Sequence, residues 1–572
     1  MLLSIIALAG SLLSPTAQAA EDDWDFNLEG YYRTRGYAFS QMATNAEADG
    51  SKGWGNYMVH RLRIQPELNF EDRAKFVMMA DLLDDVVWGD NSSLMPASVF
   101  AQDPGYTHMT GGSQDFFQRQ TAGPIIKRAW MEFKVPVGLV RVGRQESNWG
   151  MGILSNNGNG FEEGPVGENH WGSTFDRAMF ATRPIAVVQG ITGKEDSGIP
   201  FFMAVGVDRL VEDPMDTYYG YSCSTTDAAE DIITKDSHPD AYDPRCDQIN
   251  STTQQNGQDG IHDTQHDYID KTRVPSDRDD LYFMDRDDDA WEMVYVAVYK
   301  GEDVSLFGAK GDLTLGSYVI DRRHNESDSR VQIYDIHTKF LRRGVYFEGE
   351  VVNIRGKSSG LALPGTYDPA SKLPNPLYKD VDIWGWAART GYLRPAYSAL
   401  MEAGFSSGDD NVADDSFTGR PLHPDYNVGL ILYEEVLSRV TSRTWSNEAY
   451  ALWSRGGVWN SYYIYPHVRV RPMDNWEFNG AFLLAWPHKP DGSRILCQAS
   501  DNVKCASPAR ESLAQEIGWE VDLSAKTTFH EHINFTMEAG YAQISNRVPL
   551  ANLGLDPEGK FLTFQSRIAY EF

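Results

Sequence analysis

Two pairs of arginines are the first residues in this chain whose type and spacing indicate a chemical role. Arg33 and Arg35 lie in one alternating segment near the N-terminus, and Arg61 and Arg63 lie in the next. Alternation of apolar and polar residues is the period of a β-strand, so each pair occupies one face of its strand. That face either meets solvent in a soluble sheet, or lines a water-filled interior while the apolar face meets lipid. In the second arrangement the four guanidinium groups lie at similar height and favour anions.

The same alternation assigns further charged residues to the interior. The other bases predicted to line it are Arg128, Lys134, Arg141, Arg469 and Arg471. The acids are Glu348, Glu350, Glu477, Glu516, Glu520, Asp522 and Glu538. Bases and acids thus lie on different strands, and opposed walls of this kind would create a field across the lumen. Two interpretations stay open for any single arginine: it selects passing anions, or it belongs to a salt-bridge ladder that stiffens the wall.

Eighteen segments carry strand-like alternation, and most are long enough to cross a bilayer as tilted strands. They are 24–40, 56–71, 73–88, 125–136, 138–148, 174–184, 199–210, 290–300, 311–323, 330–341, 344–357, 378–391, 394–407, 460–472, 474–487, 512–527, 530–543 and 560–572. If both chain ends lie in the periplasm, nearly every long connection falls outside, and most periplasmic ones are very short. A soluble all-β protein has no reason to sort its loops this way. We therefore predict an all-β fold, a transmembrane antiparallel up-and-down β-barrel of about 18 strands (16–18).

Composition supports a single large architecture and limits the partners. The 572 residues show no linker-like break, and the formal net charge of −30 argues against a nucleic-acid partner. The segment 211–289 holds 21 acids and 6 bases, a net charge of −15, and we interpret it as a long acidic external loop. Several tryptophans, among them Trp24, Trp88 and Trp149, lie at or near predicted strand ends, where a membrane barrel carries its interfacial girdles.

The N-terminus indicates export. Residues 1–19 read as a signal peptide, with an apolar run followed by Ala17-Gln18-Ala19 as a small-x-small cleavage site, although residues 1–20 contain no Lys or Arg. This leaves 20–572 as a single barrel domain, located in the outer membrane of a Gram-negative cell. The exported compartment is oxidising, and the four cysteines allow three pairings, of which we favour the local pairs Cys223 with Cys246 and Cys497 with Cys505.

Three further features of the sequence concern metal binding, the course of one long connection, and catalysis. Asp285, Asp287 and Asp289 could supply oxygen ligands to Ca²⁺, but their surroundings do not fit an EF-hand, so a solvated acidic loop is the default and no cofactor is required. The connection 149–172 has seven glycines in its 24 residues; it either folds into the lumen as a constriction or remains an ordinary external loop. No G-x-S-x-G, phosphate-binding loop or C-x-x-C motif is present, so we do not expect an enzyme.

The C-terminal residues Ile568, Tyr570 and Phe572 resemble the signal by which the barrel-assembly machinery recognises outer-membrane proteins. Three further segments, LEGYYRTRGY, VGRQESNWGMGIL and SSGDDNVADDSF, the last followed by HPDY, resemble the alginate-export-type family of porin-like barrels. That resemblance implies an eighteen-stranded barrel and passive movement of a polyanionic polysaccharide through an arginine-rich pore.

Two functions follow from these patterns. The first is an outer-membrane, porin-like channel that passes small or polymeric anionic or sugar-like solutes through an arginine-lined lumen. The second is a plugged receptor or adhesin barrel that acts through acidic, disulfide-stapled external loops. In either case the partners are outer-membrane lipid and the barrel-assembly machinery, and in the first also the anionic or sugar solute.

Overall fold

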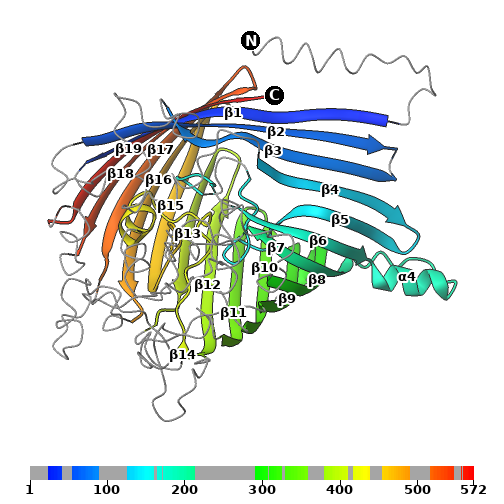
Figure 1. Ribbon diagram of the computed structural model, residues 1–572. Coiled ribbons are helices and arrows are strands. Elements are labelled where there is room, and N and C mark those ends of the chain that lie inside the picture. The colour runs from blue at the N-terminus through cyan, green and yellow to red at the C-terminus, as the bar shows by residue number, and fades with distance from the viewer. Residues whose placement is uncertain are drawn as a thin grey trace, which may run out of the picture.

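A computed structural model describes residues 24–40, 54–71, 73–88, 125–159, 164–170, 172–212, 290–306, 308–324, 329–358, 379–409, 416–438, 454–489, 516–545, 556 and 558–572. Its strands form one sheet, and because β1 pairs with β19 the sheet closes on itself as a barrel (Figure 1). The predicted signal peptide, both cysteine pairs, the three aspartates considered for Ca²⁺ and nearly all of the acidic loop lie outside the described residues.

The described chain contains nineteen strands, one α-helix and one π-helix. The strands are β1 (Trp24–Ser40), β2 (Trp54–Phe70), β3 (Ala74–Val87), β4 (Ile125–Val135), β5 (Gly138–Ser147), β6 (Ser173–Thr182), β7 (Phe201–Glu212), β8 (Ala290–Leu306), β9 (Ala309–His324), β10 (Ser329–Arg342), β11 (Val345–Ser358), β12 (Lys379–Leu393), β13 (Tyr397–Ser406), β14 (Ser416–Phe417), β15 (Ser461–Met473), β16 (Trp476–Pro487), β17 (Gly518–Phe529), β18 (Ile533–Ile544) and β19 (Lys560–Glu571). The helices are α4 (Pro184–Ile191) and the π-helix η1 (Leu432–Leu437).

The eighteen predicted strands are all present, and the predicted antiparallel barrel is confirmed. β14 is a two-residue bridge that pairs in parallel with β12, while β13 pairs directly with β15, so β14 is not part of the closed wall. The other eighteen described strands form that wall, each antiparallel to its neighbours. β14, α4 and η1 were not predicted, because elements this short carry too few residues to show a period.

The outer surface of the wall is apolar. On β19 the side chains of Phe564, Ile568 and Tyr570 are at least half exposed, and they alternate with buried residues that face inward. Water would solvate a continuous apolar surface of this kind poorly, whereas lipid accommodates it. The structure is thus a transmembrane β-barrel, and the residues of the predicted assembly signal lie on its lipid face. Trp24 and Trp88 are also exposed, as a girdle requires.

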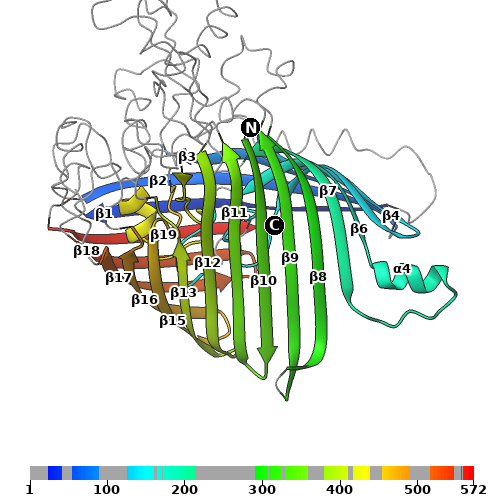
Figure 2. The same cartoon turned by 90° about the horizontal axis from the view of Figure 1, so that it is seen from below.

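One end of the barrel carries short turns, which we call the turn end; the other is the loop end. Between β10 and β11 the connection is only Arg343 and Gly344, both with positive φ (47° and 93°), the conformation that a tight hairpin needs. The connection from β6 to β7 is longer and contains α4, which projects from the turn end (Figure 2). No helix in the described part of the chain is long and apolar enough to cross a membrane.

Two connections from the loop end fold into the barrel. The first inward loop joins β5 to β6 and is described for residues 148–159, 164–170 and 172; the second joins β13 to β15 and is described for 407–409, 416–438 and 454–460. Ile153 of the first and Val428 and Leu432 of the second are fully buried. They belong to one apolar cluster that includes the lumen-facing side chains of Ile320 and Val352 on the wall. The apolar core of this protein therefore lies inside its barrel.

The inward fold of the first loop settles the alternative left open by its glycine content and corrects the expectation for Trp149. This tryptophan is not part of an interfacial girdle. Its ring stacks on Tyr318 at a centroid distance of 5.2 Å, and its indole N–H donates to Asp335 Oδ1 at 2.9 Å. The strand β5 ends at Ser147, so Trp149 turns with the loop into the lumen instead of continuing along the lipid face.

Candidate functional site

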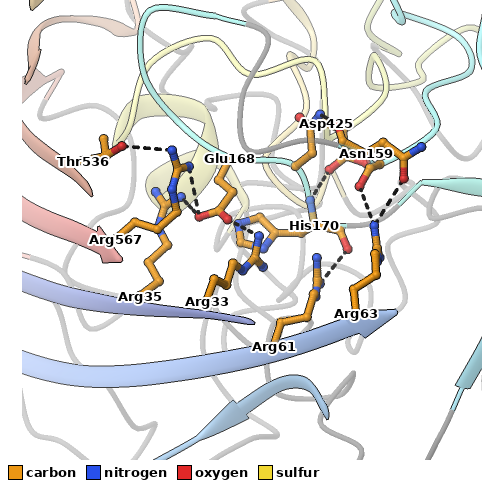
Figure 3. Close-up of polar contacts among 12 residues, drawn as sticks. Arg33, Arg35, Arg61, Arg63, Asn159, Glu168, His170, Asp425, Thr536 and Arg567 are labelled. Atoms are coloured by element: carbon orange, nitrogen blue, oxygen red, sulfur yellow. Dashed lines mark hydrogen bonds and ion pairs between the residues drawn. The ribbon is translucent and has the colours of Figure 1, made fainter. Parts of the chain in front are cut away.

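Five arginines converge on the lumen face of β19, β1 and β2, and we call them the arginine cluster: Arg33, Arg35, Arg61, Arg63 and Arg567. The strand register places Arg33 directly opposite Arg61, and Arg35 directly opposite Arg567. None of the five is more than 5 % exposed. Figure 3 shows the guanidinium groups gathered beneath the two inward loops. The structure thus brings together all four arginines singled out in the sequence and adds a fifth.

Like charges that face each other across a strand pair are destabilising, so the cluster needs anionic partners. Glu168 of the first inward loop forms ion pairs with Arg33 and Arg35 and lies 3.9 Å from Arg567 Nη1.

Two wall carboxylates complete the set. Asp81 accepts two hydrogen bonds from Arg63, at 2.7 and 2.8 Å. Glu538 lies 3.1 Å from Arg35 Nη2. Among the described residues, these three carboxylates are thus the ones whose ion pairs with the five arginines define the cluster.

Three members of this site were not singled out in the sequence. Arg567 could have been found, because it alternates with Ile568 and so occupies the inner face of the last strand. Asp81 shares a face with the buried Val77 and Met79, and an acid within that apolar run was an available signal. Glu168 carries no comparable signal, because its position depends on how an irregular loop folds.

The environment of Glu168 has a clear effect on its ionisation. Burial alone would raise the pKa of this carboxyl, but Arg33, Arg35 and Arg567 lower it to about 2. Glu168 is therefore ionised at any physiological pH.

The two inward loops support each other at the cluster. Asp425 of the second loop accepts hydrogen bonds from the backbone N–H groups of His170 and Gly172, both at 2.6 Å. The Asn427 side chain donates to the backbone carbonyl of Glu168 at 3.2 Å. Arg61 in turn donates to the carbonyl of His170 at 3.1 Å. The position of Glu168 thus depends on both loops as well as on the wall.

A Ser-His-Asp arrangement at the edge of the site does not have the geometry of a catalytic triad. His423 Nε2 lies 3.2 Å from Ser173 Oγ, and His423 Nδ1 lies 3.8 Å from Asp425 Oδ2. However, Nδ1 accepts a hydrogen bond from the backbone N–H of Asp425 at 3.1 Å, which assigns the ring proton to Nε2. A general base would need its free lone pair at Nε2, toward the serine. The arrangement instead attaches the second inward loop to the start of β6.

Acids on other strands of the wall bind loop backbone. Glu520 accepts hydrogen bonds from the N–H groups of Leu430, Ile431 and Leu432, at 2.6, 2.8 and 2.7 Å. Glu350 accepts one from Met151. Asp522, beside Glu520 on β17, is fully buried as well. The predicted acidic wall is therefore covered by the inward loops where these residues lie, and these acids hold loops in place.

The remaining predicted lumen residues form pairs toward the turn end. Arg471 Nη2 lies 2.6 Å from Glu477, and Arg469 Nε lies 4.0 Å from the same carboxylate. Arg141 pairs with Glu132 at 2.5 Å and lies over the ring of Trp130. These contacts match the salt-bridge-ladder interpretation.

Four more predicted residues lie elsewhere on the wall or beside it. Arg128 pairs with Glu146 at 2.8 Å, and Glu348 Oε1 accepts a hydrogen bond from His337 Nε2 at 3.0 Å. Lys134 is exposed on β4 close to its end. Glu516 requires a correction: it is exposed and precedes β17, and the neighbouring Ile517 is the buried residue, so Glu516 does not line the wall. Alternation was extended past the true start of that strand. Among the described residues, no group of acids, histidines or cysteines could hold a metal ion.

Comparison with known proteins yields no family assignment. No protein-family model matches the chain, and no curated protein matches it. Among solved structures, it is similar to Pseudomonas aeruginosa OccK11 (OpdR), at a TM-score of 0.43 and 8 % identity over 95 % of this chain and 96 % of that one. It is also similar to P. aeruginosa OccK2 (OpdF) in complex with glucuronate, at 0.43 and 9 % over 96 % of each chain. A BenF-like porin from Pseudomonas fluorescens Pf-5 gives 0.43 and 9 % over 96 % of this chain and 98 % of that one. Because these TM-scores lie below 0.5 and the identities are 8–9 %, we infer neither a family nor a solute for this chain from the similarity.

Proposed function

We propose that this protein is a channel in the outer membrane of a Gram-negative cell that passes small solutes carrying a carboxylate or another anionic group. The observation that carries the proposal is the arginine cluster: five guanidinium groups at one level of the lumen wall, with three carboxylates against them. An eighteen-stranded barrel is wide enough for an aqueous channel, and a positive constriction within it favours anions. Lipid contacts the apolar outer face, and the barrel-assembly machinery would read the terminal Phe572.

The inward loops favour small solutes over polymers. Both loops fill part of the lumen at the loop end, and their apolar side chains pack on the wall. A polysaccharide would have to pass this constriction as an extended chain. The narrower assignment to alginate-export-type barrels rests on short segments, two of which, 142–154 and 406–417, fall partly within the inward loops. We therefore favour the passage of small anions over the export of a polyanionic polysaccharide.

Conductance across planar lipid bilayers tests the proposal. Purified protein should open ion channels that prefer anions, as measured by the reversal potential in a salt gradient. Replacement of Arg33, Arg35, Arg61 and Arg63 by glutamine should lower the anion-to-cation permeability ratio by at least about fivefold, since one charge at 4 Å in water is worth about 1 kcal/mol.

The matched control is the double variant R330Q/R355Q, which removes charges from exposed pairs with Asp321 and Asp382. It should leave the ratio as in the wild type. An unchanged reversal potential in the fourfold variant would refute the role of the arginine cluster.

A receptor or adhesin barrel remains the second candidate, because the two inward loops form a buried apolar core within the lumen, as a plug would. Such a protein would bind its partner through the external loops and show no open channels in the same bilayer measurement. The presence or absence of open channels in planar bilayers therefore distinguishes the two candidates.

A further inference from the structure

The side chain of Glu168 occupies the centre of the arginine cluster, in the place where a solute anion would bind. Both of its oxygens are engaged: Oε1 with Arg33, and Oε2 with Arg35 and, at 3.9 Å, Arg567. The side chain has no exposed surface. A carboxylate held by several guanidinium groups is the usual form in which a protein binds a carboxylate ligand. Here that ligand belongs to the protein's own loop.

We propose that Glu168 is a tethered, resident anion, and that a carboxylate-bearing solute binds to Arg33, Arg35 and Arg567 by displacing it. This inference rests on the proposed channel function and adds to it a substrate class and a regulatory step. The site is closed by its own loop until a competing carboxylate arrives.

The balance of charge determines which solutes can do this. Departure of Glu168 would take away one of the three described carboxylates that pair with the five arginines. A solute with one carboxylate restores the original balance, so the exchange brings no new repulsion into a buried site. A neutral sugar of the same size would leave five arginines against two carboxylates, which is costly in an environment of low dielectric. The exchange therefore selects for the carboxylate itself.

The first inward loop is divided in a way that permits displacement of Glu168 without loss of the fold. Its early part is fixed in the apolar core, where Met151, Ile153 and Leu154 are buried. Val166 is buried in the same apolar cluster. Beyond it, residues 167–170 are held by polar contacts: the N–H of Gly167 donates to Glu538 at 2.9 Å, and the contacts of Glu168 and His170 are also polar. Polar contacts exchange readily with water or with a solute, whereas the apolar contacts do not. Residues 167–170 can thus detach while the apolar core, which includes Val166, holds the rest.

Gluconate and glucose are suitable probes, because they are similar in size and only the first carries a carboxylate. In planar bilayers, gluconate should reduce the ionic current through the wild-type channel at high concentration, and glucose should not. In the isosteric variant E168Q the concentration of gluconate that halves the current should fall about tenfold or more, because the site is no longer occupied by its own anion. The control E132Q removes a carboxylate that pairs with Arg141 away from the cluster. It should behave like the wild type.

A second measurement uses the unaltered protein and so does not depend on the folding of a variant. Saturating gluconate should increase amide hydrogen exchange in residues 167–170, whereas exchange in the strands of the wall and at Met151 to Leu154 should stay constant. Glucose should have no effect.

The outcomes separate this inference from the proposed function. If the wild type opens no channels, or if its anion preference does not depend on the arginines, the proposed function fails. If the anion preference depends on the arginines but E168Q and wild type show the same half-blocking concentration, only the role of Glu168 is overturned. Unchanged exchange of residues 167–170 at saturating gluconate overturns it as well. Folding of E168Q is checked by heat-modifiable migration in electrophoresis.

Discussion

Replacement of Glu520 by glutamine should release the second inward loop from the wall. Glu520 is fully buried and receives three backbone N–H groups, from Leu430, Ile431 and Leu432, at the start of η1. Glutamine keeps the shape but offers one oxygen in place of two, so at least one of the three N–H groups would face an amide NH₂ and lose its acceptor. A hydrogen bond to a charged group is worth about 1.5–3 kcal/mol, and the bonds that remain become weaker neutral ones.

The loss of docking free energy should therefore be about 2–4 kcal/mol, which corresponds to roughly a 30- to 700-fold increase in the undocked population. Hydrogen exchange of the amides in 430–437 measures this directly, because local opening sets their exchange rate. The same variant should also show more frequent open states in bilayer recordings, since the loop obstructs the lumen.

The control for Glu520 is D176N, which weakens an exposed pair between Asp176 and Arg144. Surface pairs contribute about 0–1 kcal/mol, so exchange in 430–437 should stay as in the wild type. If the amides of residues 430–437 in E520Q also exchange at rates within about twofold of the wild type, the Glu520 carboxylate does not hold the second inward loop. Apolar packing of the π-helix η1 would then account for docking by itself.

Two further predictions concern acidity and closure of the barrel. Because the pKa of Glu168 is lowered to about 2 from an ordinary value of 4.5, its contribution to loop docking is complete above about pH 4.5 and is lost as the pH falls through 2. The protection of amides 167–170, expressed relative to the intrinsic exchange rate at each pH, should therefore be constant from pH 7 to 5. A loss of protection already at pH 6 would contradict the assignment. At the seam between β1 and β19, a Cβ added at Gly30 would lie 2.5 Å from the Arg63 carbonyl oxygen and 2.8 Å from the Phe572 ring. The variant G30A should therefore lower the folded fraction in heat-modifiability assays. The control G36A should fold normally, because a Cβ there meets only side-chain atoms at 3.1 Å or more.

Strand positions could be predicted from the sequence because the two faces of a membrane barrel meet solvents of opposite character. On β1, for example, Trp24, Phe26 and Leu28 meet lipid while Arg33 and Arg35 point inward. The similar height of Arg33, Arg35, Arg61 and Arg63 along the barrel wall could be predicted by counting residues across the hairpin of β1 and β2. Such arguments need only local alternation and the order of the strands.

The loop contacts could not be predicted in the same way. Glu168 and Asp425 lie in irregular segments whose glycines and asparagines carry no period, and they meet because two connections far apart in sequence fold into the same space. The long stretch from Leu430 to Leu437 resembles a buried strand or helix in composition, and nothing local indicates that it packs inside a barrel. The same reason explains why Glu350 and Glu520 were interpreted as part of an ion-selecting surface. Strand alternation shows that these acids face inward, but it does not show that the backbone of the inward loops covers them.

The register of β1 has a consequence for the order in which the site can form. Arg35 contacts Gln565 across a separation of 530 residues in the chain, and the neighbouring Arg567 completes the arginine cluster from the same strand. The cluster therefore does not exist until the last strand to be synthesised has joined the first. Until Glu168 docks, this final step brings like charges together. Insertion of the first inward loop and completion of the wall are thus steps that favour each other, and a barrel that closes without its loop would carry an uncompensated charge at its seam.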